Sequence, residues 1–227
     1  MRAGGGSLLE RLKSLLERTY DMPAVVADIG PFVVGDHGYR RFYGGTVETP
    51  FAGSAELGAR TLIRETGTGI RLAIYYPDAL IRCLETHPPE RGVRESNIDA
   101  FATLVEELDH FLYLAERAVQ MRTLSLFELE LHANVSKYLV LSRFAAGRMG
   151  SLGRSRRAWL RYHLFDKAGF CDRDPRVSER YRDAARWARR FLDAIGPLAP
   201  VRRIDMLRRF HRAGAPGKLE LIGELPA

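Results

Sequence analysis

Residues 97–147, NIDAFATLVEELDHFLYLAERAVQMRTLSLFELELHANVSKYLVLSRFAAG, decide the fold predicted for this chain. Apolar residues recur at helical intervals over 97–121, and Ser125 with Glu128 has the spacing of a capping box that begins a second helix over 125–147. A short turn separates the two segments, which predicts a helical hairpin. The apolar stripe of the first helix consists of Phe101, Leu104, Leu108, Phe111, Leu112, Ala115 and Val119.

The chain before this hairpin combines one helix with short β-type runs. A capping box and a leucine stripe predict a helix over 7–20. From 24 to 76 the β-type runs are VVADI, PFVV, GTVET, ARTLIRET and IRLAIYY, and the last two flank a hairpin loop at 66–69. Because apolar side chains alternate over 70–76, one face of that strand is buried. We therefore expect a small antiparallel sheet in this part of the chain.

Further helices are predicted on both sides of the hairpin, over 78–87, 155–168, 175–195 and 201–213. The tail KLELIGEL, residues 218–225, is compatible with a last strand or with a helical turn. The sequence thus indicates an α+β fold. In this fold a small antiparallel sheet in the N-terminal lobe, residues 1–90, packs on a predominantly helical C-terminal lobe, residues 91–227.

Two acid–imidazole pairs recur in the hairpin at i, i+4 spacing, Glu106 with His110 and Glu128 with His132. This spacing places the carboxylate and the ring on the same face of a helix. Helical bundles bind metal ions in their cores with such residues on facing helices. The four residues are therefore candidate ligands of a metal-dependent enzyme.

Three observations favour a hairpin with ordinary polar pairs instead. The capping box already accounts for Glu128. The apolar stripe places His110 on the opposite face of its helix, beside Glu106. A turn near residue 123 offsets His132 from His110 by about four residues, or ~6 Å along the axis. We also expect one polar strip to be solvated or to lie between the lobes: Glu130, Asn134 and Lys137.

The stretches VEELDHFLYL and SLFELELHANVSKY resemble a family of bacterial proteins that has no assigned activity. The resemblance covers residues 104–138. It implies a bacterial origin, and it implies no cofactor, ligand or reaction.

Charge is distributed unevenly along the chain. Residues 1–140 carry a net charge of −4, whereas residues 141–218 carry +13. A basic half on a mildly acidic half indicates a surface that contacts nucleic acid or an acidic protein partner. Arginines interleaved with aromatic residues suit phosphates and bases. The candidate contact residues are Arg154, Arg156, Arg157, Arg161, Arg182, Arg186, Arg189, Arg190 and Trp159.

Other chemistry has little support in the sequence. The only two cysteines, Cys83 and Cys171, exclude a cysteine-based metal site or a disulfide framework, and we expect both to be reduced in the cytoplasm. A thiol near a helix end explains Cys171 better than a nucleophile served by His163. No apolar run is long enough to span a membrane. We expect the remaining histidines at the surface or in turns: His37, His87 and His211.

The sequence therefore predicts a bacterial, cytoplasmic binding or adaptor protein that contacts a polyanion or an acidic partner through its basic helices. Two alternatives stay open: a metal-dependent enzyme that uses the hairpin, and a structural protein that self-associates through complementary charge. The sequence specifies neither a cofactor nor an oligomeric state.

Overall fold

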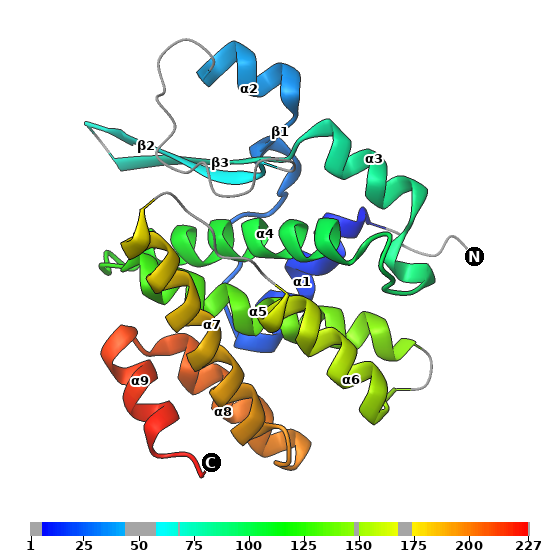
Figure 1. Ribbon diagram of the computed structural model, residues 1–227. Helices are drawn as coiled ribbons and strands as arrows, with labels where there is room; N and C mark the ends of the chain where they lie inside the picture. The colour runs from blue at the N-terminus through cyan, green and yellow to red at the C-terminus, as the bar shows by residue number, and fades with distance from the viewer. Residues whose placement is uncertain (1–5, 44–57, 68, 148–149, 168–173, 227) are drawn as a thin grey trace.

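The computed structural model describes residues 6–43, 58–67, 69–147, 150–167 and 174–226. Its strands are β1 (Val33–Val34), β2 (Arg60–Thr66) and β3 (Gly69–Tyr75). Its helices are α1 (Leu8–Tyr20), α2 (Asp36–Tyr43), α3 (Asp78–Thr86), α4 (Ile98–Val119), α5 (Leu126–Ala146), α6 (Arg154–Arg161), α7 (Pro175–Ile195), α8 (Pro200–Arg212) and α9 (Ala215–Gly223). The sheet lies on one side of α4, and α5 to α9 lie on the other (Figure 1). The predicted α+β class is confirmed.

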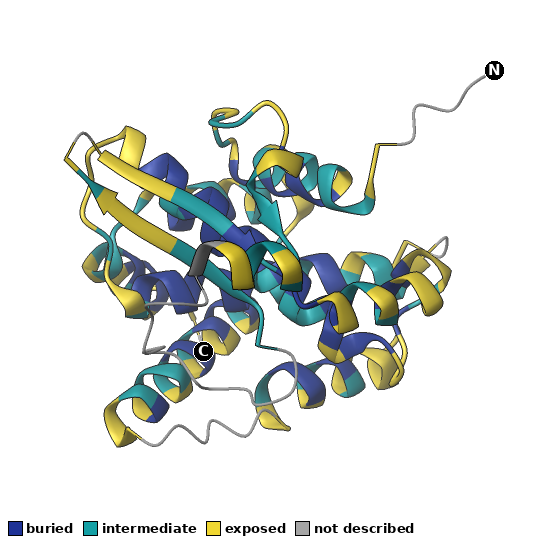
Figure 2. Cartoon of the chain, turned by 90° about the horizontal axis from the view of Figure 1, so that it is seen from above, coloured by how far each residue is buried: buried dark blue, intermediate teal, exposed yellow. Residues whose placement is uncertain are grey.

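The sheet is mixed, with strand order β1-β3-β2. Strands β2 and β3 form the predicted antiparallel hairpin, in which Ile63 pairs with Leu72 and Thr66 pairs with Gly69. The short strand β1 joins the other edge of β3 in parallel, which the prediction of an antiparallel sheet did not include. Seen from above, the strands are exposed near the hairpin tip and more buried where they cross the helices (Figure 2). The predicted run GTVET at 45–49 lies outside the described residues.

Helices α4 and α5 form the predicted hairpin. The hydroxyl of Ser125 accepts a hydrogen bond from the backbone N–H of Glu128 at 3.1 Å, so the first turn of α5 begins where the capping box indicates. Helix α1 begins in the same way at Ser7, and α7 begins at Asp174, followed by a first-turn proline. These local signals predicted the helix starts correctly.

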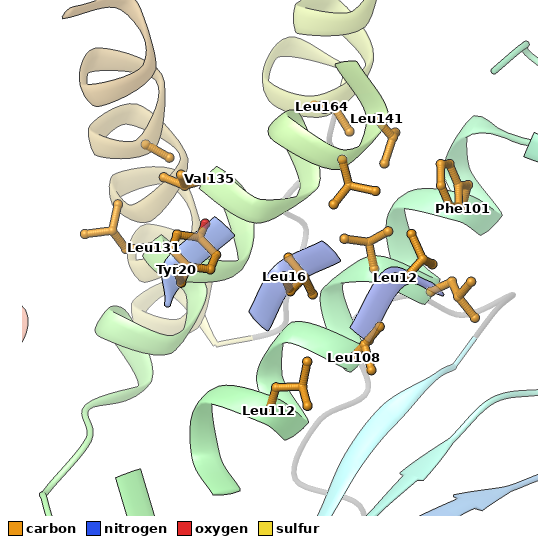
Figure 3. Close-up of a cluster of buried hydrophobic side chains, with 14 of the residues drawn as sticks. Leu12, Leu16, Tyr20, Phe101, Leu108, Leu112, Leu131, Val135, Leu141 and Leu164 are labelled. Carbon is orange, nitrogen blue, oxygen red and sulfur yellow. The ribbon is translucent and has the colours of Figure 1, made fainter. Parts of the chain in front are cut away.

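The hydrophobic core joins α1 to both helices of the hairpin. Leu12, Leu16 and Tyr20 project from α1 toward Leu108 of α4 and Leu131 of α5 (Figure 3). None of these five residues is more than 2% exposed. The core cluster also includes residues of β3 and of α7 to α9, so it draws on both predicted lobes.

Long-range contacts decide several elements that local patterns leave open. The helix α2 was not predicted; it begins where the backbone N–H of Asp36 donates to Asp78, while the N–H of Asp78 donates back to Asp36. The tail 218–225 belongs mainly to a helix, α9. Helix α6 ends at Arg161, and a π-helical turn follows it. Among the described helices, none has the length and apolar composition needed to cross a membrane.

Candidate functional site

Two of the four predicted metal ligands meet a third residue at the interface between α4 and α5. Glu106 and His110 of α4 lie beside Glu130 of α5, and one donor atom from each residue lies within 4.8 Å of the other two. We call Glu106, His110 and Glu130 the carboxylate–imidazole cluster. Glu128 and His132 have other partners, so the structure divides the four predicted residues between two places.

His110 is buried, contrary to the helical phase that placed it opposite the core. Its residue is 7% exposed, because α4 packs against the sheet on one side and against α1 and α5 on others. Glu130 is 5% exposed and Asn134 is also buried, so the solvated alternative for this strip is wrong at both positions, while a place between the lobes stays a prediction. A helix that is covered on several sides has no single buried stripe, and the apolar pattern then reports only part of its buried surface.

The two nitrogens of His110 face different carboxylates. Its Nδ1 lies 3.6 Å from Oε2 of Glu107, and that carboxylate also accepts a hydrogen bond of 2.9 Å from the hydroxyl of Thr61 in β2. Its Nε2 lies 3.9 Å from Oε2 of Glu130, which is too long for a hydrogen bond. Both of these atoms are buried and have no hydrogen-bond partner. His110 therefore lies between two carboxylates, and neither of its ring nitrogens is within normal hydrogen-bond distance of them.

Negative charge is in excess around the cluster. Three carboxylates, those of Glu106, Glu107 and Glu130, surround His110, and the Nζ of Lys137 lies 3.0 Å from Oε1 of Glu106. Burial opposes protonation of His110, but these carboxylates outweigh it and raise the pKa of its ring to about 9. Burial raises the pKa of Glu130 to about 7, although His110 acts in the opposite direction.

A second set of buried polar side chains connects α4, α5 and α8. Nδ1 of His132 lies 2.8 Å from Oδ2 of Asp109, and its Nε2 lies 3.0 Å from Nδ1 of His211 in α8. The other nitrogen of His211 lies 2.7 Å from Glu116. Burial lowers the pKa of His132 to about 4, so its ring is neutral at physiological pH. His211 is 2% exposed, so its predicted surface position is wrong; the sequence has no local signal for this long-range pairing.

Glu128 belongs to this second region. Its backbone serves the capping box as predicted, but its carboxylate is buried and accepts hydrogen bonds from Tyr113 at 2.5 Å and from Lys218 at 3.3 Å. It also accepts the backbone N–H of Ala215 at 3.0 Å, which begins α9. The guanidinium of Arg117 lies 3.7 Å away. These contacts fully engage Glu128 in holding the C-terminal helices.

The predicted basic residues of α6 lie near acidic or carbonyl groups of the same chain. Arg161 forms an ion pair with Asp193, and Arg156 donates to the carbonyl of Val93. The indole of Trp159 donates to Glu95 at 2.9 Å, and His163 contacts the same carboxylate. Arg154 and Arg157 are exposed. Cys171, the suggested partner of His163, lies outside the described residues.

On α7, the four predicted arginines form one exposed face. Arg182, Arg186, Arg189 and Arg190 are separated by four, three and one residues, which places them along one side of the helix. Arg186 lies 3.1 Å from Asp183, and Arg189 lies 2.7 Å from Asp166. We call these four residues the arginine stripe.

Comparison with known protein families, with curated proteins and with solved structures gave no match. The resemblance of residues 104–138 to a bacterial family therefore stays a prediction, and the argument for function rests on the geometry of the sites.

Proposed function

We propose that this protein binds a divalent metal ion at the carboxylate–imidazole cluster. The observation that carries the proposal is a pair of buried atoms that make no hydrogen bond, Nε2 of His110 and Oε2 of Glu130, which form a long ion pair at 3.9 Å. Leaving a buried polar atom without a hydrogen bond is costly, so such atoms are few in natural proteins. A metal ion between them would satisfy both.

The geometry is close to that of a metal site with one nitrogen and two oxygen ligands. With bonds of about 2.1 Å and a tetrahedral angle, a ligand pair is separated by about 3.4 Å, so closure of about 0.5 Å brings His110 and Glu130 to that separation. Glu106, whose side chain is 23% exposed, supplies the third ligand and the side from which an ion enters. One imidazole with two carboxylates suits Zn²⁺ or Mn²⁺.

The cluster lies between two helices and next to the sheet, which favours a structural or regulatory ion. Glu106 and His110 belong to α4 and Glu130 to α5, and the hydroxyl of Thr61 in β2 donates to Glu107 beside the imidazole. A cavity of about 300 Å³ lies elsewhere, between β1 and α3, where it is lined by Gly35, Asp78 and Arg82 among others. The proposed function of the cluster is therefore metal binding alone.

Isothermal titration calorimetry of the full chain with Zn²⁺ and with Mn²⁺ tests the proposal. We expect one ion per chain for the natural sequence and loss of binding in His110→Gln and Glu130→Gln. Glu65→Gln is the matched control, because it removes an exposed carboxylate from the sheet hairpin. Absence of binding to the natural sequence, or equal binding to all variants, would overturn the proposal.

A second candidate function is contact with nucleic acid through the arginine stripe. Its support is the exposed, one-sided placement of four arginines, since ion pairs at the surface contribute little and leave such residues available to phosphates. An acidic protein partner and self-association through complementary charge stay as the other expectations for this surface.

Fluorescence anisotropy with mixed-sequence DNA and RNA at two salt concentrations tests the second candidate. Binding should weaken steeply with salt and fall further in Arg186→Gln/Arg190→Gln. The double variant Arg71→Gln/Arg91→Gln removes the same charge from other exposed positions and should bind as the natural sequence does. Equal losses in both double variants would indicate that net charge, and not the arginine stripe, causes binding. No binding at low salt would exclude nucleic acid as the partner.

A further inference from the structure

The turn between α4 and α5 carries three exposed aliphatic side chains. Val119 ends α4 and is 71% exposed, Met121 lies in the turn and is 93% exposed, and Leu126 begins α5 and is 46% exposed. We call these three residues the apolar tip. Apolar residues that are exposed singly are ordinary, whereas several at one place mark a contact surface. The apolar tip is therefore a candidate docking surface.

The backbone at Met121 is one that favours glycine. Its φ is 52°, in the left-handed region, where a side chain is disfavoured. The N–H of Met121 donates to the carbonyl of Ala118 at 3.1 Å, and the N–H of Arg122 donates to that of Arg117 at 2.9 Å. These two bonds form a Schellman motif, in which Met121 occupies the position usually taken by glycine. Because its side chain also packs on almost nothing, the stability of the free chain does not explain a methionine here.

Arginines from the turn, from α8 and from α1 lie beside the apolar tip. The guanidinium of Arg122 donates to the backbone carbonyl of Arg212 at 3.0 Å, which places the end of α8 against the turn. One helical turn earlier, Arg208 donates to the backbone carbonyl of Arg18 in α1 at 3.5 Å. Asp21 pairs with Arg212 at 2.8 Å and offsets one of these charges, so a positive excess remains. We call the four arginines the basic rim.

We infer that the apolar tip and the basic rim dock on the surface of an anionic lipid bilayer. The acyl region of a bilayer accepts aliphatic side chains, and the phosphates of its headgroups pair with guanidinium groups. The long arginine side chains keep their charge at the level of the headgroups while the apolar tip enters. Nucleic acid fits this surface less well, because aliphatic side chains have no ring that stacks on a base. The inference is independent of the proposed metal site.

Sedimentation of the full chain with lipid vesicles tests this inference. Vesicles of phosphatidylcholine and phosphatidylglycerol in equal parts should bind the chain at least about tenfold more tightly than phosphatidylcholine alone, and salt should weaken the binding. Met121→Gly should weaken binding by about tenfold or more and leave Tm unchanged or raised, because glycine suits the left-handed backbone.

A matched pair of valines controls for exposed apolar surface in general. Val119→Ser should weaken vesicle binding as Met121→Gly does. Val201→Ser should bind as the natural sequence does, because Val201 is 72% exposed but lies in the first turn of α8, at the opposite end from Arg212. Arg186→Gln/Arg190→Gln, which removes charge from the arginine stripe, should keep most of the binding.

Several results would overturn the inference. The natural sequence would fail to bind the anionic vesicles, or Met121→Gly and Val119→Ser would bind as tightly as Val201→Ser. Loss of binding in the arginine-stripe variant alone would assign the vesicle contact to α7. Self-association that Met121→Gly abolishes, without any vesicle binding, would assign the apolar tip to a second copy of the chain.

Discussion

Binding of Zn²⁺ at the cluster should raise the melting temperature of this protein. An ion that binds only the folded chain stabilises it by about 2.7 kcal/mol when its free concentration is 100 times the dissociation constant. For a chain of this length, 1 kcal/mol corresponds to about 2–4 °C in Tm. At that free concentration we therefore expect Zn²⁺ to raise Tm by about 5–11 °C.

The substitution Glu130→Gln should separate the effect of the ion from that of the fold. The buried carboxylate has a pKa raised to about 7 by burial, so its ionised form is disfavoured inside the protein. Replacing it with a neutral amide of the same shape should leave the metal-free protein at least as stable as the natural sequence. The same replacement removes a ligand, so the gain in Tm on adding Zn²⁺ should disappear.

Differential scanning calorimetry at pH 7.5, with a chelator or with Zn²⁺, measures both effects. Glu65→Gln should keep the full gain in Tm, because its side chain is exposed in the sheet hairpin and is not part of the cluster. The reasoning would be refuted if Glu130→Gln kept the gain, or if the natural sequence showed none at a Zn²⁺ concentration that saturates a calorimetric titration.

Three further predictions concern the fold. Leu108→Ala should lower the free energy of unfolding by about 2–5 kcal/mol in urea titrations, because the side chain is fully buried; a loss below 1 kcal/mol would contradict its place in the core. Ser125→Ala should cost about 1 kcal/mol in the same assay through loss of the cap of α5, and an unchanged midpoint would disprove the cap. Burial lowers the pKa of Lys218 to about 8 against 10.5 in the unfolded chain, so its charge destabilises the fold below pH 8 and ceases to do so as pH rises to 10.5. The stability of the natural sequence relative to Lys218→Met should thus rise by ~3 kcal/mol over that range, and a constant difference would refute the assignment.

Local patterns were sufficient for much of the fold. The cap at Ser125 and the apolar spacing around Leu108 predicted the two long helices, and alternation predicted the hairpin of β2 and β3. These features depend on neighbours in the sequence, which a single chain displays directly. The helix α2 was missed because Asp78, which caps it, lies 42 residues from Asp36.

The candidate site was only half predictable. The i, i+4 spacing identified Glu106 with His110, yet helical phase placed His110 outside the core and left Glu130 in a strip that was either solvated or between the lobes. Phase fails for a helix that is covered on several sides, as α4 is by the sheet, α1 and α5. The predicted register between α4 and α5 offset His132 from His110 by about four residues. The structure instead pairs His132 with Asp109, the residue before His110.

The sequence by itself determined most of the helices, but neither α2 nor α9, together with the strand hairpin and the segregation of positive charge, because capping, periodicity and composition are properties of short segments. Only the tertiary structure decided that His110 faces Glu130 and that His211 is buried against His132. The physical reason is that burial and the pairing of polar atoms arise where distant segments meet. A side chain's partner across such an interface is set by packing, which no local pattern records.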